Sequence, residues 1–377
     1  MTITKKSKIK LNPSVIKALI ESSGFSIEEV AKKSKIQKEF LEKGEITIPQ
    51  LKRLAEVLKR PLVAFFSDEV PELPRTIDYR LNRGKAINPQ VFLAQRRLLY
   101  LLHKLKEMGV KNSIIPTFRS IKSPFELAKL FRNYLKIETI KNEKPRVALD
   151  KYKQVLEDKL KILIIEYPLR PLREKGLDDV RAFSVVYYGL AGIVLNEYDF
   201  PTVKLFSLFH EVCHILRRSS GICSMEYETE QKYKEESFCN KFAAEFLVPY
   251  DDIKNELEKL KGYDSDEHIS EVVDSFSKIY AVSKQVILLR LLHLGILTDK
   301  KFSILIKKFE EGKLREHGFV NWKEKFRNRI GGLVLEVVRQ AFEENKLSFH
   351  EVIEIFDVKT KYAESFLKHN DETTNII

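Results

Sequence analysis

Hydrophobic residues in the first 67 positions recur every three to four residues, which is the spacing of one buried helical face. Asn12-Pro13 begins one predicted helix, and the capping box Ser26-Ile27-Glu28-Glu29 begins a second. A third helix is predicted over residues 36–42, and a fourth begins near residue 47. Short helices in this order are typical of a helix-turn-helix bundle.

The hydrophobic pattern changes to β-branched and aromatic runs between residues 162 and 196. Three such runs predict a small sheet, and they cover residues 162–165, 182–188 and 192–196. Helical spacing dominates before these runs, as in residues 87–108, and again after them to the end of the chain. The sequence therefore predicts a predominantly helical α+β fold. An edge of the sheet could hold an extended peptide by strand addition, whereas an ordinary α+β core would have no peptide groove.

Composition narrows the class of protein. A length of 377 residues allows two or three domains, and no apolar run approaches the length of a membrane span. Three cysteines do not suggest a disulfide framework, and the first residues lack the apolar block of a secretory signal, so we expect a cytoplasmic protein without membrane partners.

The net charge indicates which class of partner the protein would bind. The net charge of +12 favours an acidic partner, nucleic acid first, although a lysine-rich composition alone also produces basic surfaces. Residues 1–67 hold fourteen Lys and Arg against seven Glu.

The strongest chemical signal is a His-Glu-x-x-His motif at His210, Glu211 and His214, inside an apolar helical run. Two histidines four residues apart project from one helical face, so both imidazoles can reach one Zn²⁺ ion. A glutamate beside the open coordination position can act as a general base towards water. The alternative is a buried helix with two hydrogen-bonded histidines and no metal.

A third protein ligand is expected because a catalytic zinc site commonly has three. Residues 234–249 form a predicted helix that ends at Pro249 and places Glu236 and Asn240 on one face. Glu236 could complete the ligand set, and Asn240 could hold an imidazole N–H. Glu235 and Glu245 remain competing candidates for the third ligand.

Together these two helices resemble the ImmA/IrrE family of zinc metallo-endopeptidases. Residues 206–216 are similar to its Phe-x-x-x-His-Glu-x-x-His-x-Leu pattern, and residues 236–249 to its Glu-x-x-Ala-Asn-x-Phe-Ala-x-Glu-Leu-Leu-x-Pro pattern. Residues 282–292 also resemble its Val-Ser-x-x-x-x-x-x-Arg-Leu element. The resemblance implies a zincin-like metallopeptidase domain with a small sheet. It assigns zinc ligation to His210, His214 and Glu236, and general-base chemistry to Glu211.

The N-terminal residues resemble a second part of such proteins. Residues 11–80 are similar to the XRE-type helix-turn-helix domain that often precedes these peptidases, and Ile77-Asp78-Tyr79-Arg80 resembles its Asp-Phe-Arg element. The interval from residue 36 to 44 is a few residues shorter than in the family, which shortens the expected DNA-reading helix. A docking module for protein alone is the alternative. Candidate nucleic-acid contacts are Lys35, Gln37, Lys38 and Lys43.

We therefore predict four segments. They are a helix-turn-helix domain at 1–75, a helical connector at 76–120, a metallopeptidase domain at 121–295 and a C-terminal helical region at 296–377. The resemblance implies cleavage of a helix-turn-helix repressor, or of a co-encoded partner protein, in a stress or mobile-element response. The alternative is a DNA-binding regulator or antitoxin-like binding protein whose zinc site is structural or vestigial.

The cysteines allow one further hypothesis. Cys213 and Cys239 are expected to be small buried side chains. Cys223 lies in a predicted loop over residues 219–231, from which its thiolate could block the open zinc position.

Overall fold

A computed structural model describes ten segments of the chain. They are residues 8–23, 25–58, 60–67, 89–116, 118, 121–169, 180–218, 229–260, 266–311 and 321–367. The chain divides into two compact units, one formed by residues 1–97 with 168–180 and the other by residues 98–167 with 181–377. We describe each unit by itself.

The N-terminal unit is a small helical bundle closed by a two-stranded sheet. Its elements are β1 (Lys8–Lys10), α1 (Pro13–Glu21), α2 (Ile27–Ser34), α3 (Lys38–Lys43), β2 (Glu45–Thr47), α4 (Ile48–Leu58) and the 3₁₀ helix η1 (Leu62–Phe66). The four predicted helices are present, and both the Asn12 cap and the Ser26–Glu29 capping box form. The antiparallel pairing of β1 with β2 was not predicted, because three-residue strands leave almost no pattern in a sequence.

Gly44 makes this pairing possible. Its φ of +69° ends α3 in the left-handed region, and a Cβ there would lie 2.2 Å from the Leu11 carbonyl oxygen. The Gly44 carbonyl accepts a hydrogen bond from Leu11 N–H at 2.9 Å, so the close approach brings the two strands together.

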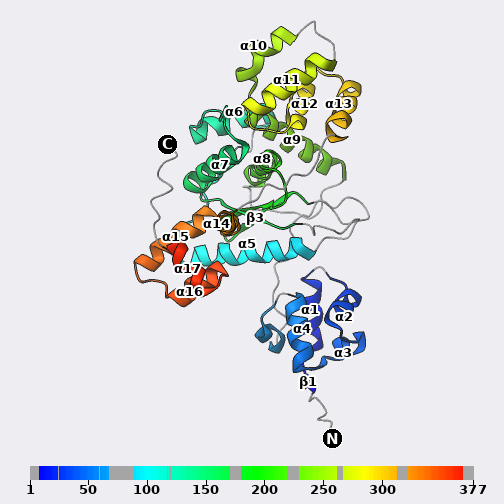
Figure 1. Ribbon diagram of the computed structural model, residues 1–377, viewed down its shortest axis with the longest axis vertical. Coiled ribbons are helices and arrows are strands. Elements are labelled where there is room, and N and C mark those ends of the chain that lie inside the picture. Colours follow the sequence, from blue (N-terminus) through cyan, green and yellow to red (C-terminus); the bar gives the residue numbers. More distant parts are fainter. Residues whose placement is uncertain are drawn as a thin grey trace. The chain divides into compact units, whose positions relative to one another are not determined.

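The second unit holds the three-stranded sheet and most of the helices (Figure 1). The elements from here to the C-terminus are α5 (Pro89–Glu107), α6 (Pro124–Leu135), α7 (Pro145–Leu160), β3 (Leu163–Tyr167), β4 (Ala182–Tyr187), β5 (Leu190–Asn196), α8 (Pro201–Arg218), α9 (Thr229–Leu247), α10 (Tyr250–Leu260), α11 (Asp266–Ile279), α12 (Lys284–His293), α13 (Asp299–Glu311), α14 (Trp322–Ile330), α15 (Gly332–Glu343), α16 (Phe349–Phe356) and α17 (Thr360–Leu367). Helix α5 begins in the first unit and continues into the second. Helix α9 begins at Thr229, so the end of the predicted loop over 219–231 is helical.

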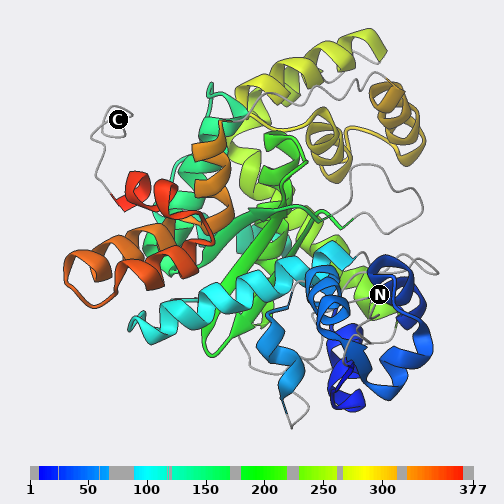
Figure 2. The ribbon, with the colours of Figure 1, turned by 60° about the horizontal axis from the view of Figure 1, so that its bottom comes forward.

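The sheet has the order β3-β5-β4, with β3 parallel and β4 antiparallel to the central strand. Every residue of β5 is buried, because helices cover both faces of the strand. Ile193 and its neighbours pack in the core formed with α7 and α8, whereas a Cβ at Gly192 would meet Leu98 of α5. In Figure 1, α7 and α8 accordingly lie above the sheet and α5 lies below it. In Figure 2, where the bottom of the first view is turned forward, α5 runs in front of the sheet.

A two-residue turn at Tyr188 and Gly189 joins β4 to β5. Both residues have positive φ, 45° and 79°, as the tight hairpin turns that match strand twist require. The resulting register pairs Ser184 with Ile193, so Ser184 faces the α8 layer.

Helices α14 and α15 pack against the outer strand β3, close to two buried glutamates, Glu157 and Glu166. Burial alone would raise the pKa of Glu166, but Lys153, Lys204 and Arg146 surround the carboxylate and lower its pKa. Nearby, a Cβ at Gly332 would lie 2.5 Å from an oxygen of Glu157, so the start of α15 rests against that carboxyl group.

The observed architecture confirms the predicted fold class, a predominantly helical α+β protein with small sheets. Among the residues that the structure describes, no helix has both the length and the hydrophobicity needed to cross a membrane.

Candidate metal centre

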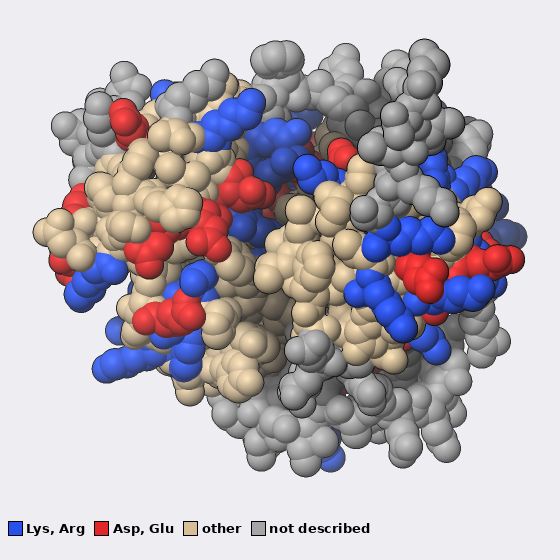
Figure 3. All heavy atoms as spheres, turned by 90° about the horizontal axis from the view of Figure 1, so that it is seen from below, with Lys and Arg blue, Asp and Glu red and all other residues tan. Residues whose placement is uncertain are grey.

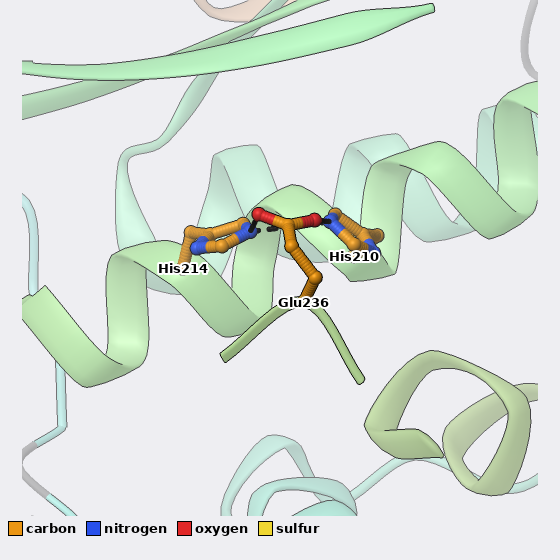
Figure 4. Close-up of side chains that lie close together, drawn as sticks. All are labelled: His210, His214 and Glu236. Carbon is orange, nitrogen blue, oxygen red and sulfur yellow. Dashed lines mark hydrogen bonds and ion pairs between the residues drawn. The ribbon is translucent and has the colours of Figure 1, made fainter. Parts of the chain in front are cut away.

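Two packed helices, α8 and α9, bring three of the predicted site residues together. His210 and His214 lie one turn apart on α8 and are almost fully buried, at 6% and 3% exposed. Glu236 reaches between them from α9 (Figure 4). The surrounding apolar residues of both helices form part of the main hydrophobic core, so the positions of the ligands are fixed by packing on both sides.

The distances between the three side chains fit one metal ion. His210 Nε2 lies 3.1 Å from His214 Nε2, and Glu236 carboxylate oxygens lie 3.4 Å and 3.7 Å from these nitrogens. Ligand atoms bound tetrahedrally to zinc at 2.0–2.1 Å stand about 3.3 Å apart. Two imidazole lone pairs and a carboxylate directed at one point would repel each other without a positive charge between them. The donor set therefore suits a bound cation.

Asn240 of α9 contacts the first imidazole. Its side-chain oxygen lies 2.8 Å from His210 Nδ1. Because an amide oxygen can only accept, Nδ1 carries the proton, and Nε2 presents its lone pair to the other two ligands. This contact fixes the tautomer that metal binding requires.

Glu211 has a partner that the sequence did not reveal. Ser184 of β4 donates a hydrogen bond of 2.8 Å to Glu211 Oε2, and both side chains are buried, at 7% and 4% exposed. The only local signal was a single hydroxyl in the otherwise apolar run Ala182-Phe183-Ser184-Val185-Val186. Its relevance depends on the β4–β5 register, which decides on which face of the sheet Ser184 lies.

The two competing candidates for the third ligand are engaged elsewhere. Glu235 points towards Arg217, whose Nε lies 2.5 Å from Glu235 Oε1. Glu245 forms an ion pair with Arg290, which also donates to the Val248 carbonyl at the end of α9. Burial raises the pKa of Glu245, and the Arg290 charge opposes this effect. Of these three glutamates, only Glu236 joins both histidines, while its role as a ligand stays a prediction.

Two of the three cysteines lie in the described part of the chain. Cys213 and Cys239 are fully buried and are not part of a disulfide, which matches the expectation of small core side chains. Cys223 lies outside the described residues, so its predicted access to the zinc position stays untested.

The candidate nucleic-acid contacts, Lys35, Gln37, Lys38 and Lys43, are all exposed around α3. Helix α3 has only six residues, as the short interval predicted. Lys38 pairs with Glu28 at 2.7 Å and with Glu42 at 3.7 Å, so part of the local positive charge is neutralised within the unit. On the molecular face in Figure 3, the described basic side chains likewise alternate with acidic ones. DNA binding by this unit stays a prediction.

Comparisons with known proteins bear on the second unit. Residues 157–292 match the family model Peptidase_M78, described as the IrrE N-terminal-like domain. No curated protein matches the chain. A Mycobacterium tuberculosis transcriptional regulator of known structure aligns at 16% identity and a TM-score of 0.32, over 45% of this chain and 47% of the regulator. The chain thus spans about half the length of that regulator. The matched residues include both histidines, Glu211 and Glu236, so this part of the chain is similar to the ImmA/IrrE family of metallopeptidase-type proteins.

Proposed function

We propose that this chain is a zinc-dependent endopeptidase that acts at the centre between α8 and α9. The observation that carries the proposal is the convergence of His210 Nε2, His214 Nε2 and the Glu236 carboxylate within 3.1–3.7 Å. Zinc held there would supply Lewis acidity, which polarises the scissile carbonyl and promotes loss of a proton from water.

Glu211 is the proposed general base. It follows His210 directly on α8, and Ser184 fixes one of its carboxylate oxygens. The carboxylate takes a proton from the attacking water and delivers it to the nitrogen of the departing amine, so the peptide bond is replaced by an acid and an amine. Burial of Glu211 and Ser184 keeps bulk water from competing for this hydrogen bond.

Strand β4 is the proposed guide for the substrate. It is one of the two outer strands of the three-stranded sheet and packs beside α8. Val186, towards its end, and Tyr188, in the following turn, are 56% and 74% exposed, which is unusual for large side chains next to a buried sheet. An extended peptide that added to this edge would gain main-chain hydrogen bonds beside Glu211.

The proposed substrate is a helix-turn-helix transcriptional repressor or a co-encoded partner protein, cleaved in a stress or mobile-element response. This choice rests on the resemblance of the paired helices to ImmA/IrrE peptidases and on the basic N-terminal unit, with fourteen Lys and Arg against seven Glu in residues 1–67. That unit would recognise the repressor, its operator DNA, or both.

The proposal is tested by cleavage of candidate repressors encoded beside this chain. Wild-type protein loaded with zinc is compared with Glu211→Gln, and the exposed Glu336→Gln on α15 serves as a matched control. We expect one-to-one zinc in all three proteins, and cleavage in the wild type and the control only. Loss of a general base typically costs about 10²–10⁴-fold in rate.

A different outcome would favour the second candidate function. Stoichiometric zinc with no cleavage that depends on Glu211 would indicate a DNA-binding regulator or antitoxin-like protein with a structural zinc site. A DNA mobility shift that weakens steeply with salt would add support to that function, because neutralised phosphates release counterions.

A further inference from the structure

A second group of potential metal ligands lies beside the first. His214, Glu235 and Cys239 each offer one ligand atom, and these atoms lie within 4.8 Å of one another. Glu235 and Cys239 are four residues apart on α9, so they share one helical face, and His214 approaches from α8. The set differs from the first in containing sulfur.

A positively charged group already occupies the neighbourhood of these ligands. The Arg217 guanidinium lies 2.5 Å from the Glu235 carboxylate and 4.0 Å above the ring of Phe238. Burial lowers the pKa of Arg217, but the hydrogen bond to Glu235, the charge of that carboxylate and smaller contributions from Cys213 and Cys239 together raise it. Surroundings that stabilise the guanidinium charge would also stabilise a metal cation in its place.

The Arg217 side chain can move away from Glu235. The side chains of Arg217 and Glu235 are each 33% exposed, so the arginine is anchored at the protein surface and can turn into solvent. A cation arriving from this side would meet the Glu235 carboxylate before the fully buried Cys239.

We propose that His214, Glu235 and Cys239 form a second coordination set for a thiophilic divalent cation, which displaces Arg217 from Glu235. Thiolate ligands select soft metals, whereas the first set contains only nitrogen and oxygen. With metal–sulfur bonds near 2.3 Å and metal–nitrogen bonds near 2.0 Å, tetrahedral ligand atoms stand about 3.5 Å apart, so small side-chain rotations close the set. Binding releases the thiol proton of Cys239 to solvent.

The consequence for the first centre follows from the shared histidine. An ion in the second set would be coordinated by His214, whose Nε2 also lies close to His210 and Glu236 in the first set. Binding of a thiophilic metal would therefore perturb the proposed zinc site directly, whether or not a substrate is present. Coordination by the second set itself does not depend on peptidase activity.

The test is a Cd²⁺ titration of the full-length chain, freed of metal with EDTA and followed by the ultraviolet sulfur-to-cadmium charge-transfer band. A Cys223→Ser background leaves Cys213 and Cys239 as the two thiols of the chain. We expect the band of one thiolate per chain, its loss in Cys239→Ala and its retention in Cys213→Ala. Cys213 is the matched control because it is equally buried on the neighbouring helix.

Two further variants keep the outcome interpretable if Cys239→Ala does not fold. Arg217→Gln removes the competing cation and should tighten Cd²⁺ binding about tenfold, an improvement that general damage would not produce. Glu211→Gln should leave the band unchanged, which separates this proposal from the peptidase proposal. A band that persists in folded Cys239→Ala, or Cd²⁺ binding that is unchanged or weaker in Arg217→Gln, would overturn the second set.

Discussion

Glu157 of α7 should make the second unit less stable as the pH rises, and Glu157→Gln should remove this effect. The carboxyl group is buried under the start of α15, where Ile164 N–H donates to it at 3.3 Å and the Gly332 backbone passes close by. Burial raises its pKa to about 7, although Lys153 and backbone N–H groups oppose the shift. Gln resembles the neutral acid in shape and carries no charge.

The magnitude follows from linkage between protonation and folding. The folded pKa of about 7 exceeds the ordinary value of 4.5, so the folded chain holds a proton that the unfolded chain has released between these pH values. The contribution of Glu157 to stability is therefore greatest below pH 4.5 and falls as the pH rises through 7. From pH 5 to pH 8 the loss assigned to Glu157 is about 2.5 kcal/mol, at 1.36 kcal/mol per pKa unit.

The single tryptophan, Trp322, provides the assay. It lies on α14 against Tyr362 and Phe366, close in sequence to the contact between α15 and Glu157. Urea unfolding followed by its fluorescence at pH 5 and pH 8 gives the change in free energy of unfolding for wild type, Glu157→Gln and the exposed control Glu336→Gln. We expect Glu157→Gln to lose about 2.5 kcal/mol less than the other two over this range. Equal losses in all three would refute the reasoning.

Three further perturbations test the site and its support. Asn240→Ala removes the acceptor of His210 Nδ1–H and should weaken zinc binding about 10–100-fold, measured by competition with a chelator. Ser184→Ala removes a buried hydrogen bond to the proposed general base. We expect a loss of about 1.5–3 kcal/mol, seen as a lower kcat with KM unchanged, and recovery in Ser184→Thr. Gly332→Ala places a Cβ 2.5 Å from a buried carboxylate oxygen and should lower the free energy of unfolding by about 1–3 kcal/mol.

The parts of the centre that lie within one helix were predictable from the sequence. Helix geometry brings His210 and His214 together without information from the rest of the fold. Adjacent residues on a helix point about 100° apart, so the phase of Asn240 separated Glu236 from Glu235 in the prediction. The structure shows a further difference between these two glutamates, because Glu235 forms an ion pair with Arg217.

The supports of the centre were not predictable, because they join residues far apart in sequence. Arg290 of α12 engages Glu245 of α9, and three cations from α7 and α8 converge on Glu166 of β3. A charged residue at the surface and one inside such a network look alike in a sequence. Only the packing of the helices decides which of them are buried.

Ser184 illustrates how much the chemistry depends on distant backbone geometry. Side chains alternate between the faces of a strand, so a slip of one residue in the β4–β5 pairing would turn Ser184 from the α8 face to the α5 face. The turn at Tyr188 and Gly189 prevents that slip, because its two positive φ angles define a tight connection between the strands. The orientation of Glu211 is therefore set in part by a hairpin that contains no catalytic residue. A His-Glu-x-x-His motif supplies the proposed reactive groups, and the register of the neighbouring strand holds one of them, Glu211, in place.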